Sequence, residues 1–122
     1  PLDVCERVFL TAAKFNETEK NINNPLYIQM LHRLPQFGLF LRDPDYKSYV
    51  WDTIAAACLI DPSMINEEVT LPVDVNADYS LSYGQSLAFK GKGPEGARSA
   101  RIVLGVDEDK LWRLIFACCR QL

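Results

Sequence analysis

Residues 49–52, Tyr-Val-Trp-Asp, combine side chains that could do chemistry at the point where a helix is expected to begin. A carboxylate in the first turn, Asp52, could ligate a metal ion or a substrate hydroxyl, and the indole of Trp51 could stack on a planar group. A structural role is the alternative. Asp52 could cap the helix or complement its dipole while Trp51 packs in the core.

The elements around this segment follow from caps, prolines and hydrophobic spacing. A helix is expected from Trp51 to Ile60, ended by Asp61-Pro62 because the residue before a proline avoids helical angles. Upstream, Thr11 can cap a helix from Ala12 to about Lys20, and Asn24 with Pro25 begins another. Its apolar stripe continues to Leu34, where Pro35 should interrupt it.

Alternating hydrophobic residues predict strands at the start of the chain and in its second half. The expected strand regions are residues 2–10, 69–73, 81–89 and 100–106. Asp107 is expected to cap a last helix that reaches Leu122. The fold class predicted from this order is mixed α/β, and strands without edge partners suggest that a larger sheet lies beside them.

Composition excludes several classes of function. The chain has 122 residues and 13.8 kDa, with 48% hydrophobic and 24% charged residues, which suits one globular domain. Its net charge of −3 gives no electrostatic reason to bind nucleic acid or an anionic membrane surface. The longest apolar run, residues 54–60, is far shorter than the roughly 20 residues that cross a bilayer. We therefore expect neither nucleic acid nor membrane as a partner.

The four cysteines indicate a compartment rather than a site. Cys5, Cys58, Cys118 and Cys119 form no C-x-x-C pair, and the single histidine, His32, is distant from them in sequence, so a zinc site is not indicated. Free thiols suit a reducing compartment, and a cytoplasmic location is the expectation.

Two adjacent stretches resemble the C-terminal part of the inosine-uridine-preferring nucleoside hydrolase family. Residues 51–57 (Trp-Asp-Thr-Ile-Ala-Ala-Ala) and 59–63 (Leu-Ile-Asp-Pro-Ser) are similar to the family's His-Asp or Trp-Asp pair, which leads into an alanine-rich helix ending in an Asp-Pro turn. Further segments agree in order and spacing, so that the resemblance covers nearly the whole chain: residues 2–5, 9–11, 73–75, 82–85, 102–107 and 111–112.

The resemblance implies that residues 1–122 are the C-terminal part of a single nucleoside hydrolase domain. The implied fold is Rossmann-like, with a mixed sheet flanked by helices. The family's Asp-x-Asp-x-x-x-Asp-Asp cluster and its Asn-rich ribose-binding motif do not occur in this sequence. The chain also opens on an apolar stretch without an initiator Met or a signal peptide, as if entered within a fold. The N-terminal calcium- and ribose-binding half is therefore expected to be absent, and to be a partner of this chain.

The activity implied by the resemblance is calcium-dependent hydrolysis of ribonucleosides to base and ribose. Asp52 matches the aspartate that supplies the last calcium ligand. Trp51 takes the position of the histidine that serves as general acid in inosine-uridine members. Members with Trp there resemble purine-preferring enzymes, in which the indole stacks on the leaving base. The implied substrates are inosine, adenosine and guanosine, in purine salvage. Tyr49 matches approximately a loop that closes over the substrate.

Other functions remain open from the sequence. The chain could be a truncated, non-catalytic paralogue that acts as a binding or oligomerisation module, or an unrelated small α/β domain. A homo-oligomer is expected. Calcium takes about 6–8 oxygen ligands, of which Asp52 supplies at most two, so the chain alone is expected to be inactive.

Overall fold

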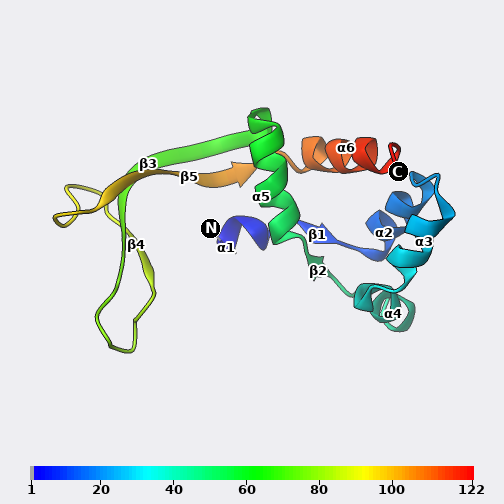
Figure 1. The fold of residues 1–122 in the computed structure, drawn as a ribbon, viewed down its shortest axis with the longest axis horizontal. Helices are drawn as coiled ribbons and strands as arrows, with labels where there is room; N and C mark the ends of the chain where they lie inside the picture. The colour runs from blue at the N-terminus through cyan, green and yellow to red at the C-terminus, as the bar shows by residue number, and fades with distance from the viewer. Residues whose placement is uncertain (1) are drawn as a thin grey trace.

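The computed structural model describes residues 2–122, and helices and strands alternate along the chain (Figure 1). In order they are α1 (Leu2–Cys5), β1 (Phe9–Leu10), α2 (Ala12–Lys20), α3 (Pro25–His32), α4 (Pro35–Arg42), β2 (Ser48–Tyr49), α5 (Trp51–Ile60), the 3₁₀ helix η1 (Pro62–Met64), β3 (Ile65–Val75), β4 (Ser86–Ala88), β5 (Arg98–Val106) and α6 (Glu108–Cys119). Helices α2, α3 and α4 gather at one end of the molecule and the β3–β4–β5 sheet extends from the other, with α1 and α5 between them.

The strands form two small sheets, and both are antiparallel. One pairs β1 with β2, and the other has the order β4-β3-β5. The mixed α/β class is confirmed, but the expected Rossmann-like mixed sheet is wrong for residues 2–122. Parallel neighbours need a crossover of a dozen or more residues, usually a helix, whereas β3, β4 and β5 are connected by loops, and β4 and β5 both pair antiparallel with β3.

Two of the predicted strand regions are strand over only two or three of their residues. The first, residues 2–10, is helix α1 followed by a two-residue strand. Val4, in α1, and Val8, after the turn that follows it, are both buried, so alternating apolar residues did not require a strand here. The other, residues 81–89, keeps only Ser86–Ala88 as strand β4.

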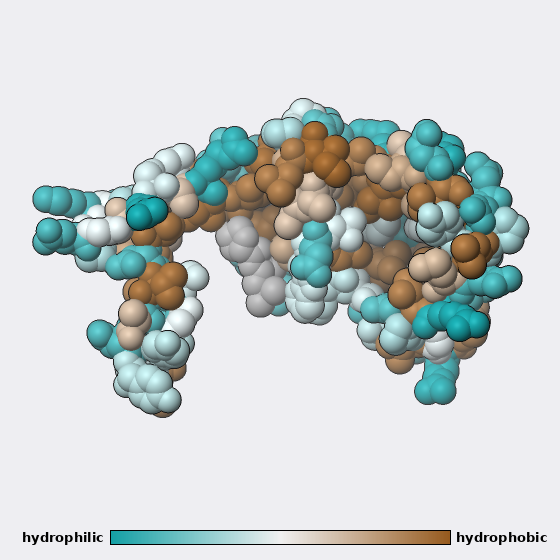
Figure 2. All heavy atoms as spheres, in the orientation of Figure 1, coloured by the Kyte–Doolittle hydropathy of each residue, from teal (hydrophilic) through white to brown (hydrophobic). Residues whose placement is uncertain are grey.

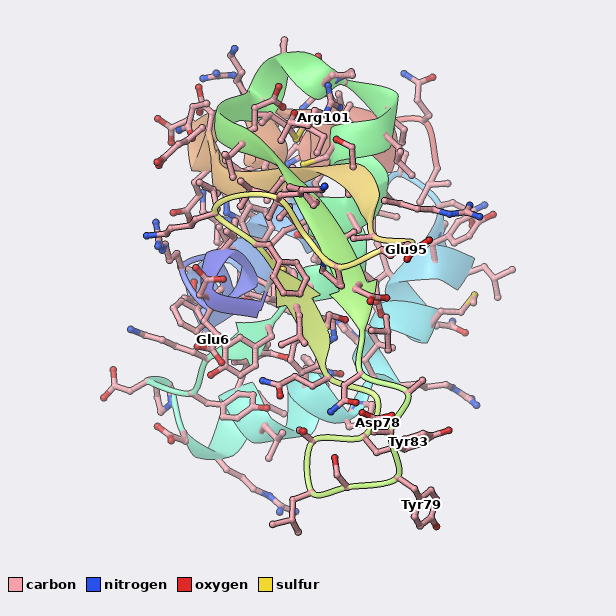
Figure 3. The ribbon with its side chains drawn as sticks, turned by 90° about the vertical axis from the view of Figure 1, so that its left-hand side faces the viewer. Glu6, Asp78, Tyr79, Tyr83, Glu95 and Arg101 are labelled. Atoms are coloured by element: carbon pink, nitrogen blue, oxygen red, sulfur yellow. The ribbon has the colours of Figure 1, made fainter. Side chains whose placement is uncertain are left out.

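A hydrogen-bonded loop, residues 76–85, takes the place of the missing strand. Asn76 donates its backbone N–H to Gln85 O at 2.9 Å, accepts the N–H of Gly84 at 2.8 Å, and donates its side-chain amide to Ser82 Oγ at 2.7 Å. Gly84 has a φ of +80°, which favours glycine there. Figure 3 shows Tyr79 and Tyr83 at the end of this loop, directed away from the rest of the protein.

The predicted helix starts are confirmed by their caps. Thr11, Asn24 and Asp107 each accept a backbone N–H of the helix that follows, from Lys14, Leu26 and Lys110 respectively. The apolar stripe after Pro25 is divided into α3 and α4, with Pro35 as the first residue of α4, as the sequence predicted. Within residues 2–122, no helix has the length and apolar character needed to cross a membrane.

The hydrophobic core lies where α5, η1 and α6 meet. Its buried side chains come from four elements or their flanks: Val8, Ile54, Ala57, Met64, Leu111, Trp112 and Phe116. This core fixes one side of α5 and thereby the position of the residues at its start.

Candidate functional site

Tyr49, Trp51 and Asp52 lie at the junction between β2 and α5, so the predicted helix start is confirmed, but Tyr49 ends a short strand rather than a loop. Tyr49 ends β2, where it is paired with Phe9 of β1, and Trp51 is the first residue of α5. The residue between them, Val50, has φ −123° and ψ 33°, so the chain passes from strand to helix within one residue. The junction is anchored because Ile54, one turn into α5, is buried in the core.

The junction carries a row of three aromatic rings, Phe9, Tyr49 and Trp51, called here the aromatic row. The ring centroids of Phe9 and Tyr49 are 5.4 Å apart with an interplanar angle of 43°. Tyr49 and Trp51 are stacked, at 5.2 Å and 11°. Lys47 Nζ lies 5.3 Å from the centre of the Phe9 ring, within cation–π range.

The aromatic row faces solvent. Tyr49 is 44% exposed and Trp51 is 47% exposed, so the indole is not a core residue. The alternative in which Trp51 packs in the core is therefore wrong. An exposed pair of flat rings is a surface on which a planar ligand can stack.

Asp52 does not cap α5. The N-cap residue is Val50 and no side chain caps the helix, so the capping alternative is wrong as well. The Asp52 carboxylate is exposed, and within residues 2–122 it forms neither a hydrogen bond nor an ion pair with another side chain. It lies in the first turn, where it still complements the helix dipole.

The residues present do not make a metal site by themselves. In the described part of the chain, no three His, Cys, Asp or Glu side chains lie close enough together to hold a metal ion. One carboxylate gives at most two of the roughly 6–8 oxygens that calcium takes. Asp52 can therefore be a calcium ligand only if other residues come from outside this chain.

His32 has a structural contact of its own. Its Nε2 is 2.9 Å from Glu19 Oε2, and its ring stacks on Phe37 with centroids 4.4 Å apart. These contacts join α2, α3 and α4 and give the exposed His32 a structural role between them.

The other end of α5 is fixed by an Asp-Pro turn. Asp61 accepts the backbone N–H of Ser63 at 3.0 Å. Hydrogen bonding from Ser63, through its side chain and backbone, lowers the pKa of Asp61, and the positive charge of Lys110 adds a smaller effect in the same direction. This turn connects α5 to η1 and to the buried Met64.

An apolar cavity of about 550 Å³ lies beside α5 and is lined in part by Ile54 of the core. Among its lining residues are Val4 and Cys5 of α1, Ala55, Cys58 and Leu59 of α5, and Ile102 and Val103 of β5. Burial raises the pKa of the Cys58 thiol, and the nearby Cys5 raises it further. All four cysteines are free thiols.

Sequence reasoning did not find Phe9 and Lys47 as neighbours of the site. Phe9 is separated from Tyr49 by 40 positions, and only the β1–β2 pairing brings the two rings together. No motif marks such a pairing of two-residue strands. The sequence therefore could not show that the stacking surface extends beyond Trp51.

The fold is similar to the solved structure of an inosine-guanosine nucleoside hydrolase, with a TM-score of 0.74 over 93% of this chain at 15% sequence identity. The chain spans 36% of the length of that hydrolase chain. No protein-family model and no curated protein sequence matches it. The likeness confirms the predicted resemblance at the level of fold: this chain has the fold of part of a nucleoside hydrolase.

Proposed function

We propose that this chain forms one wall of the active site of a calcium-dependent nucleoside hydrolase, which cleaves purine ribonucleosides to base and ribose. The observation that supports the proposal best is the likeness of fold to a nucleoside hydrolase, since the exposed Trp51 and Asp52 lie side by side at one helix start within that fold. The matched hydrolase is named for inosine and guanosine, which are both purine nucleosides, and Trp rather than His at position 51 agrees with that preference.

In this proposal Trp51 binds the leaving base by stacking. Tyr49 lies against one face of the indole, so the purine would stack on the opposite face. Cleavage of the glycosidic bond builds positive charge on the ribose, and protonation of the base improves it as a leaving group. The electron-rich indole face stabilises a protonated base by about 0.5–2 kcal/mol, as in other cation–π contacts. Trp51 would therefore assist departure of the base without donating a proton itself.

Asp52 is proposed as the single ligand that this wall adds to a calcium site. The carboxylate is exposed and engages no other side chain within residues 2–122, which leaves both oxygens available. The remaining ligands would come from the rest of the hydrolase domain. The chain by itself is therefore expected not to hydrolyse nucleosides.

The test is hydrolysis of inosine by the protein purified from its source, with and without calcium. Trp51→Ala and Asp52→Asn should each lower kcat/KM by roughly 10²-fold or more, as expected for groups that assist leaving-group departure or complete a metal site. Tyr79→Ala, on the loop of residues 76–85, is the matched control because that side chain is 99% exposed and distant from the site in sequence.

Absence of calcium-dependent hydrolysis in the wild-type protein would contradict the proposal. The chain would then be better described as a non-catalytic binding or oligomerisation module, the alternative that the sequence left open. Loss of activity in the Tyr79→Ala control would show instead that the assay reports general damage to the protein.

A further inference from the structure

Strand β4 forms a free edge of the β4-β3-β5 sheet. It pairs with β3 alone, and its residues, Ser86–Ala88, are all exposed. None of them is charged or a proline, although such residues commonly protect an edge strand from pairing with another chain. Figure 1 shows β4 on an arm that extends away from the helices, and Figure 2 shows hydrophobic residues exposed along this arm. The edge is therefore accessible to another polypeptide segment.

The ladder between β4 and β3 determines which backbone groups are free at this edge. On one side of Leu87, Phe89 donates its N–H to the β3 residue opposite at 3.0 Å, and on the other side Gln85 accepts an N–H from the residue after β3 at 2.9 Å. Hydrogen-bonded and free positions alternate along an antiparallel strand. Ser86 and Ala88 therefore direct their N–H and C=O groups away from β3.

This pattern is self-complementary about Leu87. When two β4 strands lie antiparallel with Leu87 opposite its own copy, Ser86 of one strand is opposite Ala88 of the other. Each such pair can exchange N–H···O bonds, so that every outward group of β4 acquires a partner. The two Leu87 side chains, each 38% exposed in the single chain, then meet in a closely spaced position. A contact of this kind is the same on both copies and closes with two of them.

The charges that flank β4 favour the same pairing. Loop 76–85 contains one charged residue, Asp78, and two lysines follow β4, Lys90 and Lys92. Within residues 2–122 none of the three forms an ion pair. Figure 3 shows Asp78 near the end of the arm. Because the strands are antiparallel, the loop of one copy would lie along residues 90–92 of the other, so opposite charges would meet.

Strand β5, the other edge of the sheet, is less suited to pairing with its own copy. Helix α1 already contacts it. It carries two exposed arginines, Arg98 and Arg101, which would raise the positive charge where two copies meet, and Arg101 is already paired with Glu68 at 3.3 Å. Like charges opposite each other destabilise a strand pair.

We propose that the edge of β4 is a dimer interface, at which a second copy of this chain adds its own β4 antiparallel, with the two Leu87 side chains at the twofold axis. Asp78 of each copy then lies near Lys92 of the other. The sheet runs continuously through both copies, as in other recognition by strand addition. This inference does not depend on the proposed function, because no residue of the β2–α5 junction takes part.

Cysteine trapping tests the register. Directly opposite residues at a position without hydrogen bonds have Cα atoms about 4.5 Å apart, a distance that a disulfide spans. Leu87→Cys is introduced into the protein at its natural length and treated with oxidised glutathione, which accepts the two electrons of disulfide formation. Most of the protein should become a covalent dimer bridged at residue 87, identified by mass spectrometry. Leu39→Cys on α4 is the matched control, since Leu39 is also 38% exposed, and should give no more dimer than the wild type.

Analytical ultracentrifugation measures the dimer without a covalent bond. Leu87→Lys places like charges at the axis and should raise the dissociation constant about tenfold or more, whereas Leu39→Lys should leave it unchanged. Asp78→Lys should weaken the dimer about 3- to 10-fold, because each surface ion pair occurs twice, and Lys92→Asp in the same chain should restore it. Asp78 and Lys92 form no ion pair within residues 2–122, so these variants test the interface even if Leu87→Lys disturbs the arm.

Three results would overturn the inference. The wild-type protein could be monomeric at all concentrations, Leu39→Cys could be trapped as readily as Leu87→Cys, or the dimer could be equally tight in Leu87→Lys and Asp78→Lys. Hydrolysis of inosine is measured on the same samples. A dimer that forms through β4 but does not hydrolyse inosine would contradict the proposed function and leave the interface intact.

Discussion

Tyr49 and Trp51 are stacked with ring centroids 5.2 Å apart and planes 11° from parallel, although one ends a strand and the other begins a helix. Val50 between them has φ −123° and ψ 33°, which turns the chain from strand into helix while the two rings stay in contact. Tyr49 thereby lies against one face of the indole.

Replacement of Tyr49 should make the Trp51 side chain more mobile, because the stacked ring on one face of the indole is lost. An aromatic pair contributes about 0.5–1.5 kcal/mol, so Tyr49→Ala should weaken binding of a purine to the assembled protein by roughly 2- to 10-fold, and Tyr49→Phe should not. Quenching of tryptophan fluorescence by acrylamide reports on the Trp51 side chain, because Trp51 is 47% exposed whereas the other tryptophan, Trp112, is 3% exposed. Equal quenching in Tyr49→Ala and Tyr49→Phe would contradict a role for the stack.

Asp52 should matter little for the stability of the isolated chain. It makes no cap, so Asp52→Asn removes only a dipole interaction of about 0.3–1 kcal/mol, which salt screens. Asp107→Ala removes a true cap on α6 and should cost about 0.5–2 kcal/mol at any salt concentration. Urea unfolding of both variants at low and high salt makes the comparison. A large, salt-independent loss in Asp52→Asn would mean that Asp52 has a structural role.

Asp61 should contribute a pH-dependent component of stability. Hydrogen bonding from Ser63 holds the pKa of Asp61 below its usual value of 3.8. Because the folded pKa is the lower one, the stabilisation is present above about pH 3.8 and is lost as the pH falls through the folded value. Unfolding of wild type and Ser63→Ala is followed from pH 7 to pH 2. The difference in free energy of unfolding between wild type and Ser63→Ala should shrink at the acidic end. A difference that stays constant over this pH range would contradict the pKa shift of Asp61.

The core between η1 and α6 should be sensitive to truncation. Leu111 is fully buried, so Leu111→Ala should destabilise the chain by about 2–5 kcal/mol through lost burial and a cavity. Leu81→Ala, in the exposed loop of residues 76–85, is the matched control and should change stability by less than about 0.5 kcal/mol. Thermal unfolding followed by circular dichroism measures both. Equal effects would mean that the core is misplaced.

Local signals predicted the helices well because caps and prolines act over a few residues. Thr11, Asn24 and Asp107 each cap the helix that the sequence assigned to them, and α5 spans Trp51–Ile60 as expected. The strands were predicted less well. The direction of β3, β4 and β5 depends on how they pair, and the length of β4 depends on hydrogen bonds that Asn76 makes instead of a ladder.

The site was predicted in part. The sequence placed Tyr49, Trp51 and Asp52 together at a helix start, and the structure confirms that placement. The sequence could not place Phe9 beside Tyr49, because that contact depends on the pairing of two strands that are 40 positions apart. The roles of Trp51 on a purine and of Asp52 on calcium stay predictions, since both depend on groups outside this chain.

Helix α5 contains only Ile, Ala, Cys and Leu after Thr53, yet Leu59 is 85% exposed and Ile60 is 69% exposed within residues 2–122. A helix that is hydrophobic all round normally lies inside a protein. If the proposed function holds, hydrolysis during refolding should recover only after these side chains become buried, so that recovery of activity would time the covering of α5.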